Sequence, residues 1–209
     1  MEGRIFRLSQ LSEATSLQTR YNSMLSGNAS YNPSSFDSIA TVTVGSGGSS
    51  SVEFTSIPST YTHLQVRISA QTDRATYGLD DIKCILNSDT GANYAWHTLR
   101  GNGSTAFAGA GSSSSTPQFD SFAGTTTSNI FAAGVIDILD YKNTNKYKTL
   151  RGLGGGDHNG TIAGYGGEVG LFSNLWQNTN AITGIKFTPI FGTNFTQYTK
   201  FALYGIKGA

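Results

Sequence analysis

The alternating run from Asn194 to Lys207 constrains the fold of this chain more than any other segment. From Tyr198 onward it separates into two sets of alternate positions, as the side chains of a β-strand do. The sets are Tyr198, Lys200, Ala202, Tyr204 and Ile206 on one side, and Phe201, Leu203 and Gly205 on the other. Because both sets contain apolar side chains, the pattern predicts a strand in the middle of a sheet, covered on both faces. We therefore expect function to reside in the N-terminal residues, the loops or the outer surface.

The composition favours a β-rich protein rather than a helical enzyme. Charged residues make up 13% of the 209 residues, which is low against the usual share of roughly 25%. Gly is abundant, at 26 residues, and Pro is scarce, at 4. An aromatic content of 11% argues against a disordered chain, since disordered chains contain few aromatic residues. A net charge of +1 gives no basic surface for nucleic acid, and we expect no nucleic-acid partner.

Residues 1–35 differ in pattern from residues 36–209 and are predicted to be an N-terminal anchoring arm and linker. The apolar spacing of the arm fits either an extended conformation or a short amphipathic helix. So much apolar surface indicates docking on a partner, although a frayed terminus is the simpler alternative. The candidate anchoring residues are Ile5, Phe6, Leu8, Leu11 and Leu17.

Neither a signal peptide nor a membrane helix is expected. The start of the chain, Met1 to Leu8, lacks the long apolar core and the cleavage site of a signal peptide. No run approaches the roughly 18 apolar residues of a membrane-spanning helix. We expect the chain to be made and folded in a cytoplasm and then to stay soluble or be assembled, without a membrane partner.

Residues 36–209 are predicted to form one all-β domain, an antiparallel β-sandwich. Alternating segments and turn signals recur at the spacing typical of sandwiches and barrels, which gives roughly nine or ten strands. Thr62 to Ala70 is the clearest of these strands. Its core-facing positions are Leu64, Val66, Ile68 and Ala70. Two glycine-rich segments, Gly101 to Thr116 and Gly154 to Gly160, are predicted to be surface loops.

Histidine and cysteine positions do not indicate a metal site or a nucleophile. His63, His97 and His158 are far apart in the sequence and no cluster at ligand spacing is visible, although strands could bring His97 and His158 together. Cys84 has apolar neighbours and is predicted to be buried and inert. We expect no metal and no cofactor.

The acidic residues do not indicate acid–base catalysis either. Asp80 and Asp81 are adjacent on a predicted strand and point to opposite faces, and Asp89 lies in a turn. The chain has no nucleophile elbow and no phosphate-binding loop. We therefore predict a protein that is not an enzyme.

Glycan binding is the most plausible small-ligand function, because a sugar is held by an aromatic face and a few fixed polar groups. Aromatic and polar residues cluster near the predicted loops, although Trp96 and Trp176 are each expected more often as core residues. The candidate residues for a glycan or a host surface are Trp96, His97, Arg100, Asp157 and His158.

Several segments within residues 36–209 resemble the small β-rich virion proteins of tailed bacteriophages. The segments that carry the resemblance are Phe54 to Leu64, Asn87 to Tyr94, Ile136 to Tyr141, Gly170 to Thr183 and Asn194 to Lys207. The resemblance implies a jelly-roll-like sandwich displayed on a virion, assembled with other virion proteins after synthesis in the bacterial host. It further implies a homotrimer attached through the N-terminal arm, and it implies no catalytic residue or cofactor.

Two placements on the particle follow from this resemblance. The protein is expected to be either a capsid decoration (cement) protein or a short fibre. The alternative from a different class is a glycan-binding adhesin module of a tail fibre, with the same sandwich recognising a host surface glycan. An enzymatic function is the least favoured of these three alternatives.

Overall fold

The computed structural model describes residues 35–115, 117–124, 128–162 and 165–208. Contacts divide the chain after Ser35, and Phe36–Ala209 form one compact unit. The predicted anchoring residues Ile5, Phe6, Leu8, Leu11 and Leu17 lie outside the described residues. Within the described ranges there is no helix, and accordingly none with the length and apolar character to cross a membrane.

The described part of the chain contains twelve strands. They are β1 (Phe36–Thr43), β2 (Val52–Phe54), β3 (His63–Ala70), β4 (Leu79–Leu86), β5 (Tyr94–Gly101), β6 (Ala106–Ser114), β7 (Gln118–Ala123), β8 (Ala132–Ile138), β9 (Lys148–Ile162), β10 (Tyr165–Trp176), β11 (Ile185–Pro189) and β12 (Lys200–Ile206).

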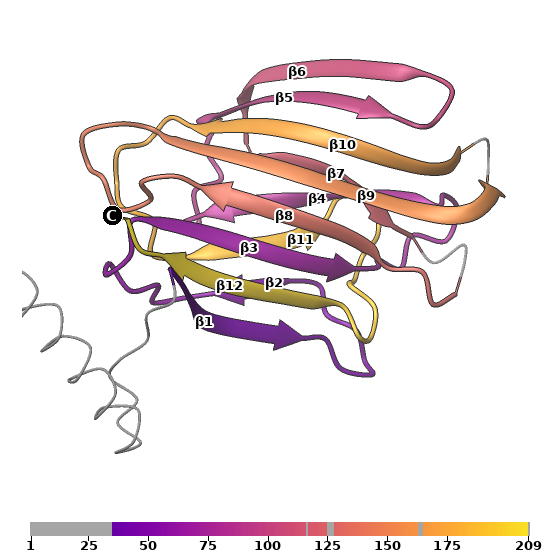
Figure 1. The fold of residues 1–209 in the computed structure, drawn as a ribbon, viewed down its shortest axis with the longest axis horizontal. Helices are drawn as coiled ribbons and strands as arrows, with labels where there is room; N and C mark the ends of the chain where they lie inside the picture. The colour runs from indigo at the N-terminus through magenta and orange to yellow at the C-terminus, as the bar shows by residue number, and fades with distance from the viewer. Residues whose placement is uncertain (1–34, 116, 125–127, 163–164, 209) are drawn as a thin grey trace, which may run out of the picture. The chain divides into compact units, whose positions relative to one another are not determined.

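The strands form two antiparallel sheets packed as a sandwich (Figure 1). The long sheet has the order β1-β12-β3-β8-β9-β10-β5-β6, and the short sheet has the order β2-β11-β4-β7. Strands β1, β12, β3 and β8 with the four strands of the short sheet have the pairing order of a jelly roll, in which the chain passes repeatedly from one sheet to the other. Two hairpins, β5–β6 and β9–β10, extend the long sheet. The predicted all-β, jelly-roll-like sandwich is confirmed.

The core lies between the sheets and is built by period-two alternation. The predicted core positions of β3, namely Leu64, Val66, Ile68 and Ala70, are all buried. Phe201 of β12 contacts the rings of Phe187 and Phe195, with centroid distances of 4.9 and 5.1 Å. Trp176 is also buried, and its Nε1 donates to Asp89 Oδ2 over 2.8 Å.

Strand β12 lies inside a sheet as predicted, between β1 and β3, but its two faces differ. Phe201 and Leu203 are fully buried, whereas Tyr204 is half-buried on the outer face. The Arg67 guanidinium covers the Tyr204 ring at 5.1 Å. The inner face is thus covered by the short sheet, whereas the outer face is covered only in part, by long side chains of the same sheet.

The predicted loop from Gly101 to Thr116 is mostly the edge strand β6. A tight turn joins it to β5, in which Asn102 Oδ1 accepts from the backbone amide of Thr105 over 2.8 Å. The small residues have a packing role, because a Cβ at Gly111 would lie 2.5 Å from Nε1 of Trp96. The half-buried Trp96 fills the space that larger β6 side chains would occupy.

The predicted loop from Gly154 to Gly160 is likewise a strand, within the long β9. Gly154 and Gly156 lie on the inner face of this strand. A Cβ at Gly156 would approach Ala132 Cβ to 3.1 Å, and one at Gly152, on the same inner face just before this segment, would approach the Phe119 ring to 2.8 Å. At Gly156 and Gly152, therefore, a larger side chain would crowd β8 of the same sheet or β7 of the other sheet.

Candidate functional site

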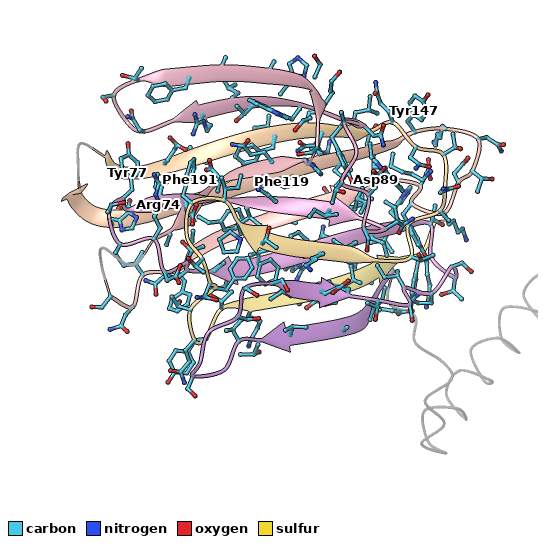
Figure 2. The ribbon with its side chains drawn as sticks, turned by 180° about the vertical axis from the view of Figure 1, so that it is seen from behind. Arg74, Tyr77, Asp89, Phe119, Tyr147 and Phe191 are labelled. Atoms are coloured by element: carbon cyan, nitrogen blue, oxygen red, sulfur yellow. The ribbon has the colours of Figure 1, made fainter. Side chains whose placement is uncertain are left out.

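A cleft of about 260 Å³ opens at one end of the sandwich. Figure 2 shows three of its residues, Arg74, Tyr77 and Phe191, gathered at that end. The lining comes from the β3–β4 loop, β4, β5, β6, β10 and the β11–β12 loop. The lining residues are Arg74, Tyr77, Leu79, Asp81, Arg100, Phe107, Glu168 and Phe191.

The side chain of Arg74 organises the aromatic part of the cleft. Its guanidinium lies 4.6 Å from the centroid of the Tyr77 ring and 4.2 Å from that of the Phe191 ring. Nη1 also donates to the carbonyl oxygen of Leu79 over 2.8 Å. A planar cation held against two rings in this way contributes attraction to both and limits their rotation.

Phe191 is 60% exposed, yet its backbone is fixed by a buried carboxylate. Asp80 is fully buried and accepts hydrogen bonds from the backbone amides of Phe191 and Gly192 at 3.0 and 2.9 Å. The Thr72 hydroxyl donates to the same carboxylate over 2.6 Å, and the amide of Asp81 donates over 2.7 Å. The exposed ring of Phe191 is therefore presented from a rigid loop.

A second carboxylate, Asp73, holds the next part of the β11–β12 loop. It accepts from the backbone amides of Thr193 and Asn194 at 2.6 and 2.9 Å, and from Nδ2 of Asn194 at 2.9 Å. Burial raises the pKa of the Asp73 carboxyl, but the hydrogen bonds from Asn194 and Thr193 outweigh it and hold the pKa below its usual value. The ionised form is thus the one that supports the loop.

This arrangement predicts a pH-dependent contribution of Asp73 to stability. Because its pKa is lower in the folded than in the unfolded chain, Asp73 stabilises the fold above the unfolded pKa of about 3.9. That contribution is lost as the pH falls through the folded pKa. We expect Asp73→Asn to lower the free energy of unfolding by about 1 kcal/mol at neutral pH and by much less near pH 3. Urea titrations of both proteins at the two pH values measure this, and an equal difference at both would contradict it.

The opposite wall of the cleft carries an ion pair between two strands of the long sheet. Arg100 Nη1 of β5 lies 3.4 Å from Glu168 Oε1 of β10, and the Glu168 side chain is only 5% exposed. The guanidinium of Arg100 also lies 5.8 Å from the Phe107 ring. With Arg74 and Asp81, the cleft contains two guanidinium groups and two carboxyl groups. Its ionised side chains carry no net charge.

The structure does not bring the predicted glycan-binding residues together. Arg100 lines the cleft, and Asp157 lines a shallower, glycine-rich hollow of about 740 Å³ beside it. Trp96 is half-buried over β6, while His97 is exposed on the outer face of the long sheet. His158 is buried against Gly78.

His97 and His158 lie on opposite faces of the long sheet, so they cannot share a ligand. The ring nitrogens of His158 make no hydrogen bond to any residue that the structure describes. His63 Nδ1 accepts from the backbone amide of Asp140 over 2.9 Å. Within the described ranges, no group of three or more His, Cys, Asp or Glu residues is placed to hold a metal ion.

The acidic and thiol groups considered for catalysis have structural contacts. Asp89 Oδ1 accepts from the backbone amide of Gly91 over 2.9 Å, which confirms its turn role. The bond from Trp176, assisted by those from Gly91 and Asn93, holds the pKa of Asp89 below its usual value. Cys84 is fully buried, and burial raises the pKa of its thiol. The prediction of a buried thiol is confirmed.

The outer face of the long sheet carries an aliphatic row, which we define as Val135, Leu153, Leu171 and Leu99. These residues are in register across β8, β9, β10 and β5. The three leucines are each at least 50% exposed, and Val135 is half-buried. Val169, also exposed, lies next to the row on β10. A continuous apolar strip on an exposed sheet face is typical of a surface that another protein covers.

Of the residues that line the cleft, sequence reasoning named Arg100 as a candidate, but it named neither the aromatic side of the cleft nor the aliphatic row. An exposed aromatic residue such as Phe191 has the same local pattern as a core residue. The sequence could indicate only part of the row. Val169 and Leu171 occupy alternate positions of β10, and they can be identified as outward-facing only once the inner face of that strand is known. The sequence matches no family model, and no curated protein or solved structure is significantly similar to it.

Proposed function

We propose that this chain is a non-enzymatic structural protein of a tailed-bacteriophage virion, displayed on the particle surface and contacting other virion proteins. The observation that carries the proposal is the aliphatic row. Three leucines that are half or more exposed and in register across neighbouring strands make a poor surface for a protein that works alone. Covering them with another protein removes apolar area from water, at roughly 25 cal/mol per Å².

Two further features support the same assignment. The jelly-roll strand order occurs in viral capsid and lectin domains, which is an analogy of fold rather than of site. The resemblance of residues 36–209 to phage virion proteins points the same way. Under this proposal, residues 1–35 anchor the chain to the particle, and the protein is a homotrimer in the virion, as a capsid decoration protein or a short fibre.

Replacing Leu171 by Glu tests the proposal in particles of the phage that encodes the chain. The variant places a charge in the middle of the aliphatic row, and burying an unpaired charge is costly. We expect Leu171→Glu to be lost from purified particles by about tenfold or more, while the isolated protein keeps its melting temperature. Quantitative mass spectrometry of the particles measures the loss, and cryo-electron microscopy locates the wild-type chain on the capsid or the tail.

Ser173→Glu is the matched control, because Ser173 is exposed two positions further along the same face of β10. It pairs with His97 and Arg151 rather than with the leucines. This control is expected to enter particles at the wild-type level. Incorporation of Leu171→Glu at that same level, or absence of the wild-type chain from particles, would refute the proposal.

A further inference from the structure

The cleft presents an exposed aromatic ring on a loop that hydrogen bonds hold in place. One side of the Phe191 ring faces the Arg74 guanidinium, and 60% of the residue remains exposed to solvent. Two carboxylates, Asp80 and Asp73, fix its loop through backbone amides. A ring held in this way loses little conformational entropy when a ligand packs on it, which favours binding.

The charges of the cleft select against an ionic ligand. Arg74 and Arg100 are balanced by Asp81 and Glu168, and Arg100 is paired directly with Glu168. An anion or cation entering here would lose hydration without gaining net attraction from the lining. A neutral ligand does not incur this cost.

The same side chains suit a ligand with many hydroxyl groups. A hydroxyl both donates and accepts, carboxylates accept several hydrogen bonds, and guanidinium groups donate several in a fixed plane. A pyranose ring also has an apolar face of C–H groups, which packs on an aromatic ring and removes it from water. The Phe191 platform beside Arg100, Glu168 and Asp81 offers both kinds of contact.

The size of the cleft agrees with a small part of a glycan. Its volume of about 260 Å³ is just under the range of roughly 300–1,000 Å³ of pockets that enclose drug-sized ligands. One or two sugar rings fit such a space, with the rest of the chain extending into solvent. We propose that this cleft binds neutral carbohydrate, with Phe191 as the stacking platform and the Arg100–Glu168 pair and Asp81 contacting hydroxyl groups.

Saturation-transfer-difference NMR on the full chain tests this proposal without any particle. The probes are lactose, maltose, cellobiose and chitobiose at millimolar concentration, with sialyllactose as the anionic comparison. We expect at least one neutral disaccharide to bind, and its affinity to fall by about tenfold or more in Phe191→Ala. The melting temperature of the variant should remain close to the wild-type value, because the side chain is largely exposed.

Tyr147→Ala provides the matched control. Tyr147 is also an exposed aromatic residue, at 52%, and it lies at the opposite end of the sandwich from Phe191 (Figure 2). The control should bind the neutral disaccharide as the wild type does. The proposal is overturned if none of the neutral disaccharides binds, whether or not sialyllactose does, or if Phe191→Ala binds as well as the wild type. None of these results depends on where the protein sits on a virion.

Discussion

Replacing Phe201 by Ala is expected to lower the free energy of unfolding by about 3–5 kcal/mol, as for other large-to-small changes at buried aromatic positions. Phe201 is fully buried on an interior strand, and its ring touches Phe187 of the short sheet and Phe195 of the β11–β12 loop. Removing it leaves a cavity at the point where three segments meet. Urea unfolding followed by far-ultraviolet circular dichroism measures the loss.

Tyr204→Ala is the control on the same strand, because Tyr204 is half-buried on the outer face beneath Arg67. Its expected cost is about 1 kcal/mol, which covers the cation–π contact and partial burial. Equal losses for Phe201→Ala and Tyr204→Ala would contradict the assignment of an inner and an outer face to β12.

Replacing Lys148 by Met is expected to cost about 2–4 kcal/mol, although Met retains most of the apolar length of the side chain. Lys148 is fully buried, and its Nζ donates to the carbonyl oxygens of Asn143, Lys146 and Thr179 at 2.6, 3.0 and 2.9 Å. The ammonium thus joins the β8–β9 turn to the segment that follows β10. Without it, three carbonyl groups lose a charged donor.

Lys146→Met tests whether the effect belongs to the buried site. Lys146 is two residues away, and its exposed ammonium pairs with Asp140. Exposed ion pairs contribute about 0–1 kcal/mol, so this variant should unfold close to the wild-type midpoint. If thermal or urea unfolding showed Lys148→Met to be as stable as Lys146→Met, the three carbonyl contacts would not be stabilising the turn.

The strands that the sequence predicted well are those whose neighbouring side chains differ in polarity. Thr62 to Ala70 alternates because one face meets the core and the other meets solvent. Strand β6 could not be predicted in the same way, since it consists mainly of Gly, Ala and Ser. These residues are small because Trp96 of the neighbouring strand occupies the space above Gly111, and that contact is set by pairing across the hairpin.

The site was less predictable than the fold because its parts come from distant segments. Arg74 and Phe191 meet only because buried Asp80 accepts hydrogen bonds from amides more than a hundred positions later in the chain. Arg100 could be suggested from its polar and aromatic neighbours along β5, whereas its partner Glu168 is supplied by register with β10. Such tertiary pairings leave no short-range pattern.

The two hairpins that lengthen the long sheet contribute core residues such as Tyr94, Phe172 and Trp176 on their inner faces and a separate recognition surface on their outer faces. A jelly roll is complete without them, because eight other strands supply both of its layers. The leucines of the aliphatic row all lie on β5, β9 and β10, and one wall of the cleft, with Arg100, Phe107 and Glu168, lies on β5, β6 and β10. Changes at the outward-facing positions of these hairpins would therefore alter what the protein recognises while their inward-facing core residues stay the same, which is a route to new specificity in small steps.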